Sequence, residues 1–427
     1  MKRFPPIFSF SFAMALSLRA GLCSAEPSGG PITLNKSYAL ALDQSETIRN
    51  LREDITRSQA RARASLGGAF PQVRWNWGDT WQDGSGTGGN NFGGFLEKNQ
   101  VESKFTLEQT LFSGLKEFSA WSGFQKQEAR DRWTLRYAEL QLFDRVAGAF
   151  YDVVGLEAAL ENSETSVALA GDRTKELKSF LRLGKSREGE VFSAESQLAA
   201  LNAIRVRLRG QIRVARENLS FLVGQEIGSI PLEDSLDGTT SETLPAFLSQ
   251  AEKRPDLEAQ RQEVLAQHLR VRYEKGSFWP TAGLRGNYYT QRPAFFEPID
   301  WDLLLSLSVP LYQGGTVSAR VKEAKSGLEQ AQQTLGHMER QVRTDVKKSF
   351  ESWTASREEA QALEEAYGAS QKSYEAQRRE YRLGLVTNLD VLNAMNLMQA
   401  AKRAWIDARV EVKRRYVALI ISTGALP

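Results

Sequence analysis

The chain has 427 residues, of which 25% are charged and 41% are hydrophobic, and its formal net charge at pH 7 is only +3. Basic side chains are interleaved with acidic ones rather than gathered in one stretch, which argues against a nucleic-acid-binding protein. Mean hydropathy is −0.41, and beyond the N-terminal segment no apolar run approaches the roughly 18 residues that a membrane-spanning helix needs. If this protein sits in a membrane, strands must cross it.

Residues 1–25 are predicted to be a secretory signal peptide. Basic residues begin this segment, Ile7–Leu18 forms its apolar core, and cleavage is expected after Ala25. Cys23 is the only cysteine and raises the alternative of a lipid anchor, but Leu22 is a poor match to the small residue that precedes a lipidated cysteine. After cleavage at Ala25 the mature chain would have no thiol chemistry and no disulfide.

The first part of the mature chain changes from a helical period to a strand period. A helix is expected from about Lys36 to Gly67, where glycines and a proline stop it. Residues 73–82 alternate between an apolar and a polar face, and a second strand is expected near Val101–Phe112. The glycine-rich segment Gly84–Phe95 between them lacks the ending of a phosphate-binding loop, so a surface turn is predicted there.

A very long helix is predicted over Leu115–Leu183. The segment has no proline, and its apolar or small residues recur every seven positions, as in a coiled-coil seam. About 69 helical residues would span roughly 100 Å. Gly184 is expected to end this helix, and a descending helix with its own seam follows. Residues 225–245 connect the two halves of the chain.

The second half repeats the same plan. Tyr381–Gly424 aligns without a gap with Leu181–Gly224, which lies 200 positions earlier. A helix is expected from about Ala246 to Ser277, then a strand from Pro280, then a second strand over Trp301–Tyr312 and another long helix. The chain is therefore predicted to consist of two structural repeats, residues 26–245 and residues 246–427.

The four expected strands have the length of tilted membrane-spanning strands, about 10–12 residues each. Four strands cannot close a barrel that hides its edges from lipid, so several chains would have to supply one. A soluble sheet with an aromatic core is the alternative. The aromatic residues that would form girdles at the membrane interfaces are Trp75, Trp77, Trp81, Phe105, Phe112, Tyr288, Trp301 and Tyr312.

Four motifs in a fixed order resemble those of the TolC-like outer membrane efflux family. They are LFSG (Leu111–Gly114), RPDLEAQ (Arg254–Gln260), LYQG (Leu311–Gly314) and YRLGLVTNLDVL (Tyr381–Leu392). The resemblance covers about residues 34–424. It implies an α+β membrane protein and a homotrimer, in which four transmembrane β-strands per chain build one 12-stranded β-barrel and the helices continue it as a coiled-coil tunnel.

The same resemblance implies a function. The chain would be the outer-membrane exit duct of a tripartite efflux pump or a type I secretion system, with its tunnel in the periplasm. Its partners would be a periplasmic adaptor, an inner-membrane pump or ABC transporter, and outer-membrane lipid, with no nucleic acid. No cofactor, metal or enzymatic activity is expected, because His268 and His337 are the only histidines and no nucleophile–base pair stands out.

The resemblance also implies a gate where the two hairpins turn. Asp390 matches the acidic residue that lines the family's constriction, so three chains would form a ring of carboxylates that attracts cations. The second family aspartate is Asn393 here. Glu190 and Tyr381 match positions that hold neighbouring coils together. A simpler role for Asp390 and Glu190 is to stabilise a helix N-terminus.

The turns themselves are expected to meet the adaptor. The residues concerned are Arg182, Leu183, Gly184, Arg382, Leu383 and Gly384. The two glycines could equally serve only to end helices in a left-handed conformation. Two other protein classes stay open: a periplasmic adaptor, which carries one hairpin between β-domains rather than two, and a coiled-coil structural protein, which would not need tryptophan-rich strands.

Overall fold

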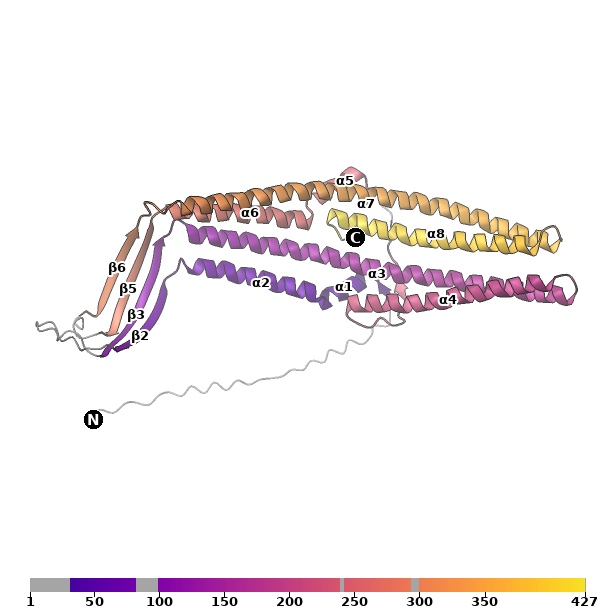
Figure 1. The fold of residues 1–427 in the computed structure, drawn as a ribbon, viewed down its shortest axis with the longest axis horizontal. Coiled ribbons are helices and arrows are strands. Elements are labelled where there is room, and N and C mark those ends of the chain that lie inside the picture. Colours follow the sequence, from indigo (N-terminus) through magenta and orange to yellow (C-terminus); the bar gives the residue numbers. More distant parts are fainter. Residues whose placement is uncertain (1–30, 82–98, 239–241, 293–298, 427) are drawn as a thin grey trace, which may run out of the picture.

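The computed structural model describes residues 31–81, 99–238, 242–292 and 299–426. The expected signal peptide with Cys23 and the glycine-rich segment Gly84–Phe95 lie outside these ranges. The described chain is elongated, with a small sheet at one end and a bundle of long helices extending from it (Figure 1). None of the described helices combines the length and the apolar character that crossing a bilayer requires.

Two long helical hairpins form most of the molecule. The first joins α3 (Lys116–Arg182, 67 residues) to α4 (Glu188–Val223, 36 residues). The second joins α7 (Thr316–Arg382, 67 residues) to α8 (Asn388–Thr423, 36 residues). The equal lengths follow from the 200-residue repeat. The predicted helix over Leu115–Leu183 is confirmed to within one residue at each end.

The four long helices lie side by side in the order α4, α3, α8, α7. The hairpin partners pack on each other, and α3 also packs on α8, which joins the two hairpins. In Figure 1, α4 and α7 form the lower and upper edges of the tip half of the bundle. Each of these two helices therefore has one side that no other long helix among the described residues covers.

Shorter helices fill the half of the bundle nearest the sheet. They are α1 (Leu34–Gln44) and α2 (Glu46–Gly67) beside α3, and α5 (Leu244–Ala251) and α6 (Pro255–Lys275) beside α7, with the short turn η1 (Gly276–Phe278) after α6. The prediction of one continuous helix over 36–67 is wrong at Ser45. Its side chain accepts a hydrogen bond from the N–H of Ile48 at 3.4 Å and so caps a new helix.

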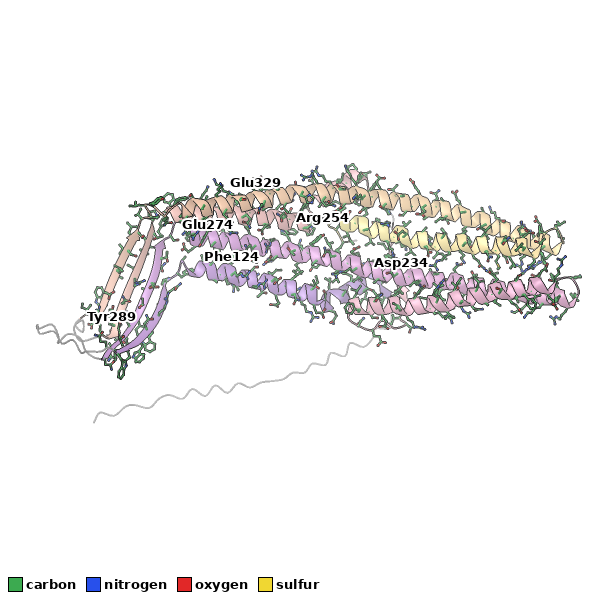
Figure 2. The ribbon with its side chains drawn as sticks, viewed as in Figure 1. Phe124, Asp234, Arg254, Glu274, Tyr289 and Glu329 are labelled. Carbon is green, nitrogen blue, oxygen red and sulfur yellow. The ribbon has the colours of Figure 1, made fainter. Side chains whose placement is uncertain are left out.

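The prediction of one helix over 246–277 is wrong at Arg254. Pro255 begins α6, and a proline has no N–H with which to continue a helix. The Arg254 guanidinium donates to both oxygens of Asp256 at 2.8 and 2.6 Å and lies 3.7 Å from Asp345 of α7. This buried ion cluster fixes the break about midway along the bundle (Figure 2).

A four-stranded antiparallel sheet caps one end of the bundle, in the order β2 (Gln72–Trp81), β3 (Asn99–Phe112), β5 (Thr281–Gln291), β6 (Trp301–Ser308). The central pair joins a strand of each repeat. The expected extent of the last strand is wrong, because it ends at Ser308 rather than at Tyr312. Pro310 cannot donate a ladder hydrogen bond, so the chain leaves the sheet before it.

The largest core cluster lies where α1, α3 and the end of α4 meet, and it includes Phe143, Phe150, Tyr151 and Leu219. A second cluster around Phe247, Val346, Trp353 and Leu419 plays the same part in the other repeat. The connector between the repeats joins both. Its short strand β4 (Leu232–Glu233) pairs with β1 (Ile32–Thr33), and the carboxylate of Asp234 accepts a hydrogen bond from Tyr151 at 3.2 Å.

Candidate functional site

The two hairpin turns lie together at the end of the bundle farthest from the sheet (Figure 1). Their backbones are nearly identical. Gly184 and Gly384 adopt φ values of 67° and 75°, and each N–H donates to a carbonyl three residues earlier at 3.0 Å. The expected helix-ending role of both glycines is confirmed. The neighbouring Leu183 and Leu383 are 64% and 74% exposed, so apolar side chains stand at the tips of both turns.

Asp390 begins α8 as part of a capping box. The Thr387 N–H and hydroxyl donate to Asp390 Oδ2 at 2.8 and 2.6 Å, and the Asp390 N–H donates to the Thr387 hydroxyl at 3.3 Å. These hydrogen bonds, the side-chain one foremost, hold the pKa of Asp390 below its ordinary value. The carboxylate is exposed, stays ionised at neutral pH, and stabilises the helix N-terminus.

Glu190 occupies the matching position in α4 but is held differently. The N-cap residue Arg187 makes no capping hydrogen bond, and the Ser186 hydroxyl instead donates to Glu190 Oε2 at 2.6 Å. Glu190 is half-buried, whereas Asp390 and Asn393 are exposed on successive turns. The two acidic positions of the repeat are therefore not equivalent.

Arg173 of α3 ties the first hairpin to the start of the second. Its side chain is almost fully buried, and its Nε and Nη2 donate to Asn388 Oδ1 at 3.1 and 2.7 Å. Its Nη1 donates to Glu176 at 2.8 Å, and its guanidinium lies 4.0 Å from the centre of the Tyr381 ring. Every face of this buried cation thus has a partner, which offsets the cost of removing it from water.

Tyr381 completes the contact between the hairpins. Its ring stacks on Phe180 with centroids 6.4 Å apart. Burial raises the pKa of the Tyr381 hydroxyl, the nearby Arg173 charge opposes that shift, and the Glu190 carboxylate adds to it. Tyr381 therefore lies close enough to Glu190 to feel its charge, whereas the Asp390 carboxylate is bonded to its own capping residue, Thr387.

Sequence reasoning missed Arg173, Glu176 and Asn388. One signal was present, because the repeat breaks at these positions: the residues 200 positions away are Ser373, Ala376 and Glu188. Differences of this kind between the repeats mark places where the two hairpins make different contacts.

The sheet has one aromatic and one polar face. Strand register places Trp75, Phe105, Tyr288 and Trp301 in a single row across all four strands. All four side chains are exposed, as are Trp77 and Trp81 on the same face. Phe112 ends β3, and Tyr312, 88% exposed, lies beyond β6 rather than in a strand. The aromatic row thus lies across the sheet, toward its far end.

Hydrogen-bonded polar side chains cross the opposite face. Asn76 donates to Thr106 at 3.2 Å, Thr106 to Asn287 at 2.9 Å, and Asn287 to Asp302 at 2.8 Å. Below this row, Arg285 and Arg74 both contact Glu108, at 2.9 and 3.1 Å. One face of the sheet therefore suits an apolar environment and the other suits water.

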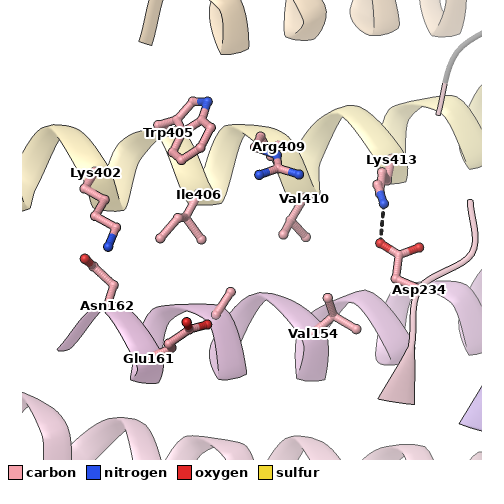
Figure 3. A pocket seen from close by; sticks show the side chains of 11 residues that line it. Val154, Glu161, Asn162, Asp234, Lys402, Trp405, Ile406, Arg409, Val410 and Lys413 are labelled. Atoms are coloured by element: carbon pink, nitrogen blue, oxygen red, sulfur yellow. Dashed lines mark hydrogen bonds and ion pairs between the residues drawn. The ribbon is translucent and has the colours of Figure 1, made fainter. Parts of the chain in front are cut away.

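A groove of about 370 Å³ lies between α3 and α8, and Figure 3 shows its mixed lining. Lys413 forms an ion pair with Asp234 at one end, and Trp405 and Val410 provide apolar surface. Within the described ranges, no group of three or more histidine, cysteine, aspartate or glutamate side chains could hold a metal ion. The groove is an open junction between the hairpins, and it shows how α3 and α8 are aligned.

Comparisons with known proteins agree with these features. The family model described as "Outer membrane efflux protein" matches residues 248–425. Outer membrane efflux protein BepC of Brucella suis biovar 1 is 25% identical over 333 residues, covering 75% of this chain and 71% of BepC. Outer membrane protein TolC of Salmonella enteritidis is 25% identical over 333 residues, covering 74% of this chain and 67% of TolC.

A solved structure of CusC has the same fold, with a TM-score of 0.83 at 16% sequence identity, over 94% of this chain and 96% of CusC. The similarities cover both the sheet and the long hairpins. In sequence the chain is similar to outer membrane efflux proteins, and in fold it is similar to CusC.

Proposed function

We propose that the chain is the outer-membrane channel of a tripartite efflux pump or a type I secretion system. The observation that carries the proposal is that one long molecule has a sheet suited to a membrane at one end and exposed helical hairpin turns at the other. A sheet with an aromatic face and a polar face stands at one end, and two hairpin turns with acidic helix starts stand about 100 Å away. A duct that crosses a membrane and continues through the adjoining aqueous space needs a membrane-compatible sheet at one end and water-exposed helices at the other.

Three copies would supply the membrane-spanning part. The strands β2 and β6 are the outer strands of a four-stranded sheet, and each has one edge without a partner in the described chain. Unpaired strand edges are not tolerated in lipid, so copies joined edge to edge would close a 12-stranded barrel. The aromatic row would then face lipid near one interface, and the row from Asn76 to Asp302 would face the lumen.

The hairpins would form the tunnel and its closed inner end. Three Asp390 carboxylates around the axis would attract cations to the mouth. Asn393 adds no second charge there. Arg173, with Asn388 and Tyr381, would hold the second hairpin against the first until opening breaks these contacts.

The exposed turns would receive the periplasmic adaptor. Leu183 and Leu383 offer apolar contacts on a rigid backbone, and Arg182 and Arg382 offer charge beside them. An inner-membrane pump or ABC transporter would act through that adaptor. The cargo, small molecules or polypeptides, would be chosen by the pump.

Fractionation combined with gel migration tests this function. The full-length chain is expressed in a Gram-negative host, and its outer membranes are isolated and run unheated and heated. We expect the chain in the outer-membrane fraction, migrating as a trimer unheated and as a monomer after boiling. A soluble or inner-membrane chain that never migrates above its monomer would contradict the proposal.

A further inference from the structure

The two edge helices carry exposed charges that have no partner within the described chain. On α4 these include Arg207, Arg213 and Glu217, and on α7 they include Lys348, Glu351 and Glu358. Two other arginines of the same stretch of α4 differ: Arg209 pairs with Glu164 at 2.7 Å, and Arg216 with Glu157 at 2.5 Å. The unpaired charges therefore mark the side of each edge helix that points away from the chain.

The junction between α3 and α8 provides a template for how edge helices can meet. A Cβ placed on Gly155 would lie 3.5 Å from Val410, and Asp152 forms an ion pair with Arg414 (the same junction as in Figure 3). These contacts fix the antiparallel register of a long helix of one hairpin against the short helix of the other. The repeat relates α3 to α7 and α8 to α4 by 200 positions.

Replacing each residue of the α3–α8 junction by its equivalent 200 positions away gives a register for α7 of one copy against α4 of another. Gly155 becomes Ala355 of α7, and Val410 becomes Gly210 of α4. In that register the unpaired charges meet with opposite signs. Arg213 faces Glu351, Glu217 faces Lys348, and Arg207 lies beside Glu358 at the flank.

We propose that α4 of one copy docks on α7 of the next in this register, with Arg213–Glu351 and Glu217–Lys348 as ion pairs between copies. The inference rests on the proposed trimer and goes beyond it by naming the faces, the register and the charges. A second copy of this chain is the occupant, because its α7 carries the charges complementary to those of α4.

Apolar complementarity supports the same pairing. Val206, Val214 and Phe221 form an exposed stripe along α4, 66%, 63% and 86% accessible. The facing side of α7 carries exposed small residues, Ala355 and Ala362. Large side chains on one helix and small ones on the other let the two helices approach closely, as knobs enter holes in a coiled coil.

Disulfide cross-linking tests the register. The variant with Gly210→Cys and Ala355→Cys should form cross-linked dimers and trimers in isolated outer membranes under mild oxidation, because Cα atoms must come within about 7 Å to be bridged. The matched variant with Gly210→Cys and Ala369→Cys moves the second thiol about 20 Å along the same face of α7 and should not cross-link. Each single variant controls for cross-links through Cys23. Cross-linking in the shifted pair alone would overturn the register.

Charge reversal tests the ion pairs. Arg213→Glu and Glu351→Arg should each lower the fraction of unheated trimer about tenfold, because like charges then face each other between copies. The variant that carries both changes should return to within about twofold of wild type. Arg403→Glu, on α8 away from this face, should leave the trimer unchanged. A double variant as poor as the singles would overturn the proposed pairs.

These outcomes distinguish an error in the α4–α7 register from an error in the proposed channel function. If all variants stay trimeric and only the expected cross-link is missing, the register is wrong and the outer-membrane channel stands. If the wild-type chain is itself never trimeric, the proposed function fails first. A different protein cross-linked to the Gly210→Cys single variant would show that α4 has another occupant.

Discussion

Arg173 donates two hydrogen bonds to the side-chain oxygen of Asn388, a residue 215 positions later in the chain. This contact joins α3 of the first hairpin to the first turn of α8 in the second. The two hydrogen bonds hold the hairpins together at the end where the tunnel would open. Because the guanidinium is buried, water cannot replace Asn388 as its acceptor when that side chain is removed.

We expect Asn388→Ala to loosen the hairpin ends. Arg173 would keep Glu176 and Tyr381 but lose two hydrogen bonds, at a cost of about 1–3 kcal/mol for a buried polar group left partly unpaired. The expected result is a larger mean conductance in planar bilayers and faster proteolysis at the tips. Asn393→Ala, an exposed amide on the next turn of α8, is the control and should behave as wild type. Equal behaviour of the two variants would contradict the role of Asn388.

The charge of Asp390 should persist to unusually low pH. Its folded pKa lies below the ordinary value of about 3.9, because Thr387 donates to the carboxylate. The stabilising cap is therefore fully present above the unfolded pKa and is lost as pH falls through the folded pKa. Cation preference, measured from reversal potentials in salt gradients, should be unchanged from pH 7 to pH 5 and should weaken only below about pH 4. Thr387→Val should move that loss to higher pH.

Two glycines with the same left-handed backbone should tolerate alanine very differently. A Cβ on Gly114 would lie 2.2 Å from the carbonyl oxygen of Gly276, whereas one on Gly184 would meet nothing within 4 Å. Gly184→Ala should cost only backbone strain, about 1–2 kcal/mol. Gly114→Ala must in addition move the backbone where the sheet joins the helices. We expect trimers from the first variant, with lower thermal stability, and a several-fold lower trimer yield from the second.

Adjacent leucines on β6 distinguish the two faces of the sheet. Leu303 lies in the strand position opposite Gly286 on the aromatic side, and Leu304 lies opposite Arg285 on the polar side. Leu303→Glu would place a carboxylate against lipid and should lower the outer-membrane yield at least about threefold. Leu304→Glu gains Arg285 as a neighbour and should insert normally. The reverse order of yields would assign the faces the other way.

The sequence predicts the long helices well because a seven-residue period sustained over many turns is a strong signal, and the repeat doubles it. The helix breaks at Ser45 and Arg254 were not predicted. Ser45 resembles any helical serine until its side chain is seen to cap Ile48, and the partner of Arg254 on α7, Asp345, is distant in the sequence. Local pattern does not report contacts of that kind.

In the candidate site, too, the sequence reveals the residues that belong to a local pattern and misses those that depend on contacts between distant segments. Asp390, Glu190 and Tyr381 could be singled out from the sequence because they belong to the repeated, family-like stretch around the turns, and their role in a gate stays a prediction. Arg173 could not, since an arginine in a charged helix usually points to solvent and its acceptor, Asn388, lies in the other hairpin. Comparing the two repeats for mismatched residues would have been the way to find it.

Single-channel recording of the purified chain and of Asp390→Ala in planar bilayers tests the channel assignment most directly. We predict discrete conductance steps with a preference for cations in the wild type. The variant should conduct more and discriminate less, because the ring of carboxylates at the mouth is gone. Absence of channel activity in the trimeric wild type, or a variant with unchanged conductance and cation preference, would contradict an acidic mouth that controls passage.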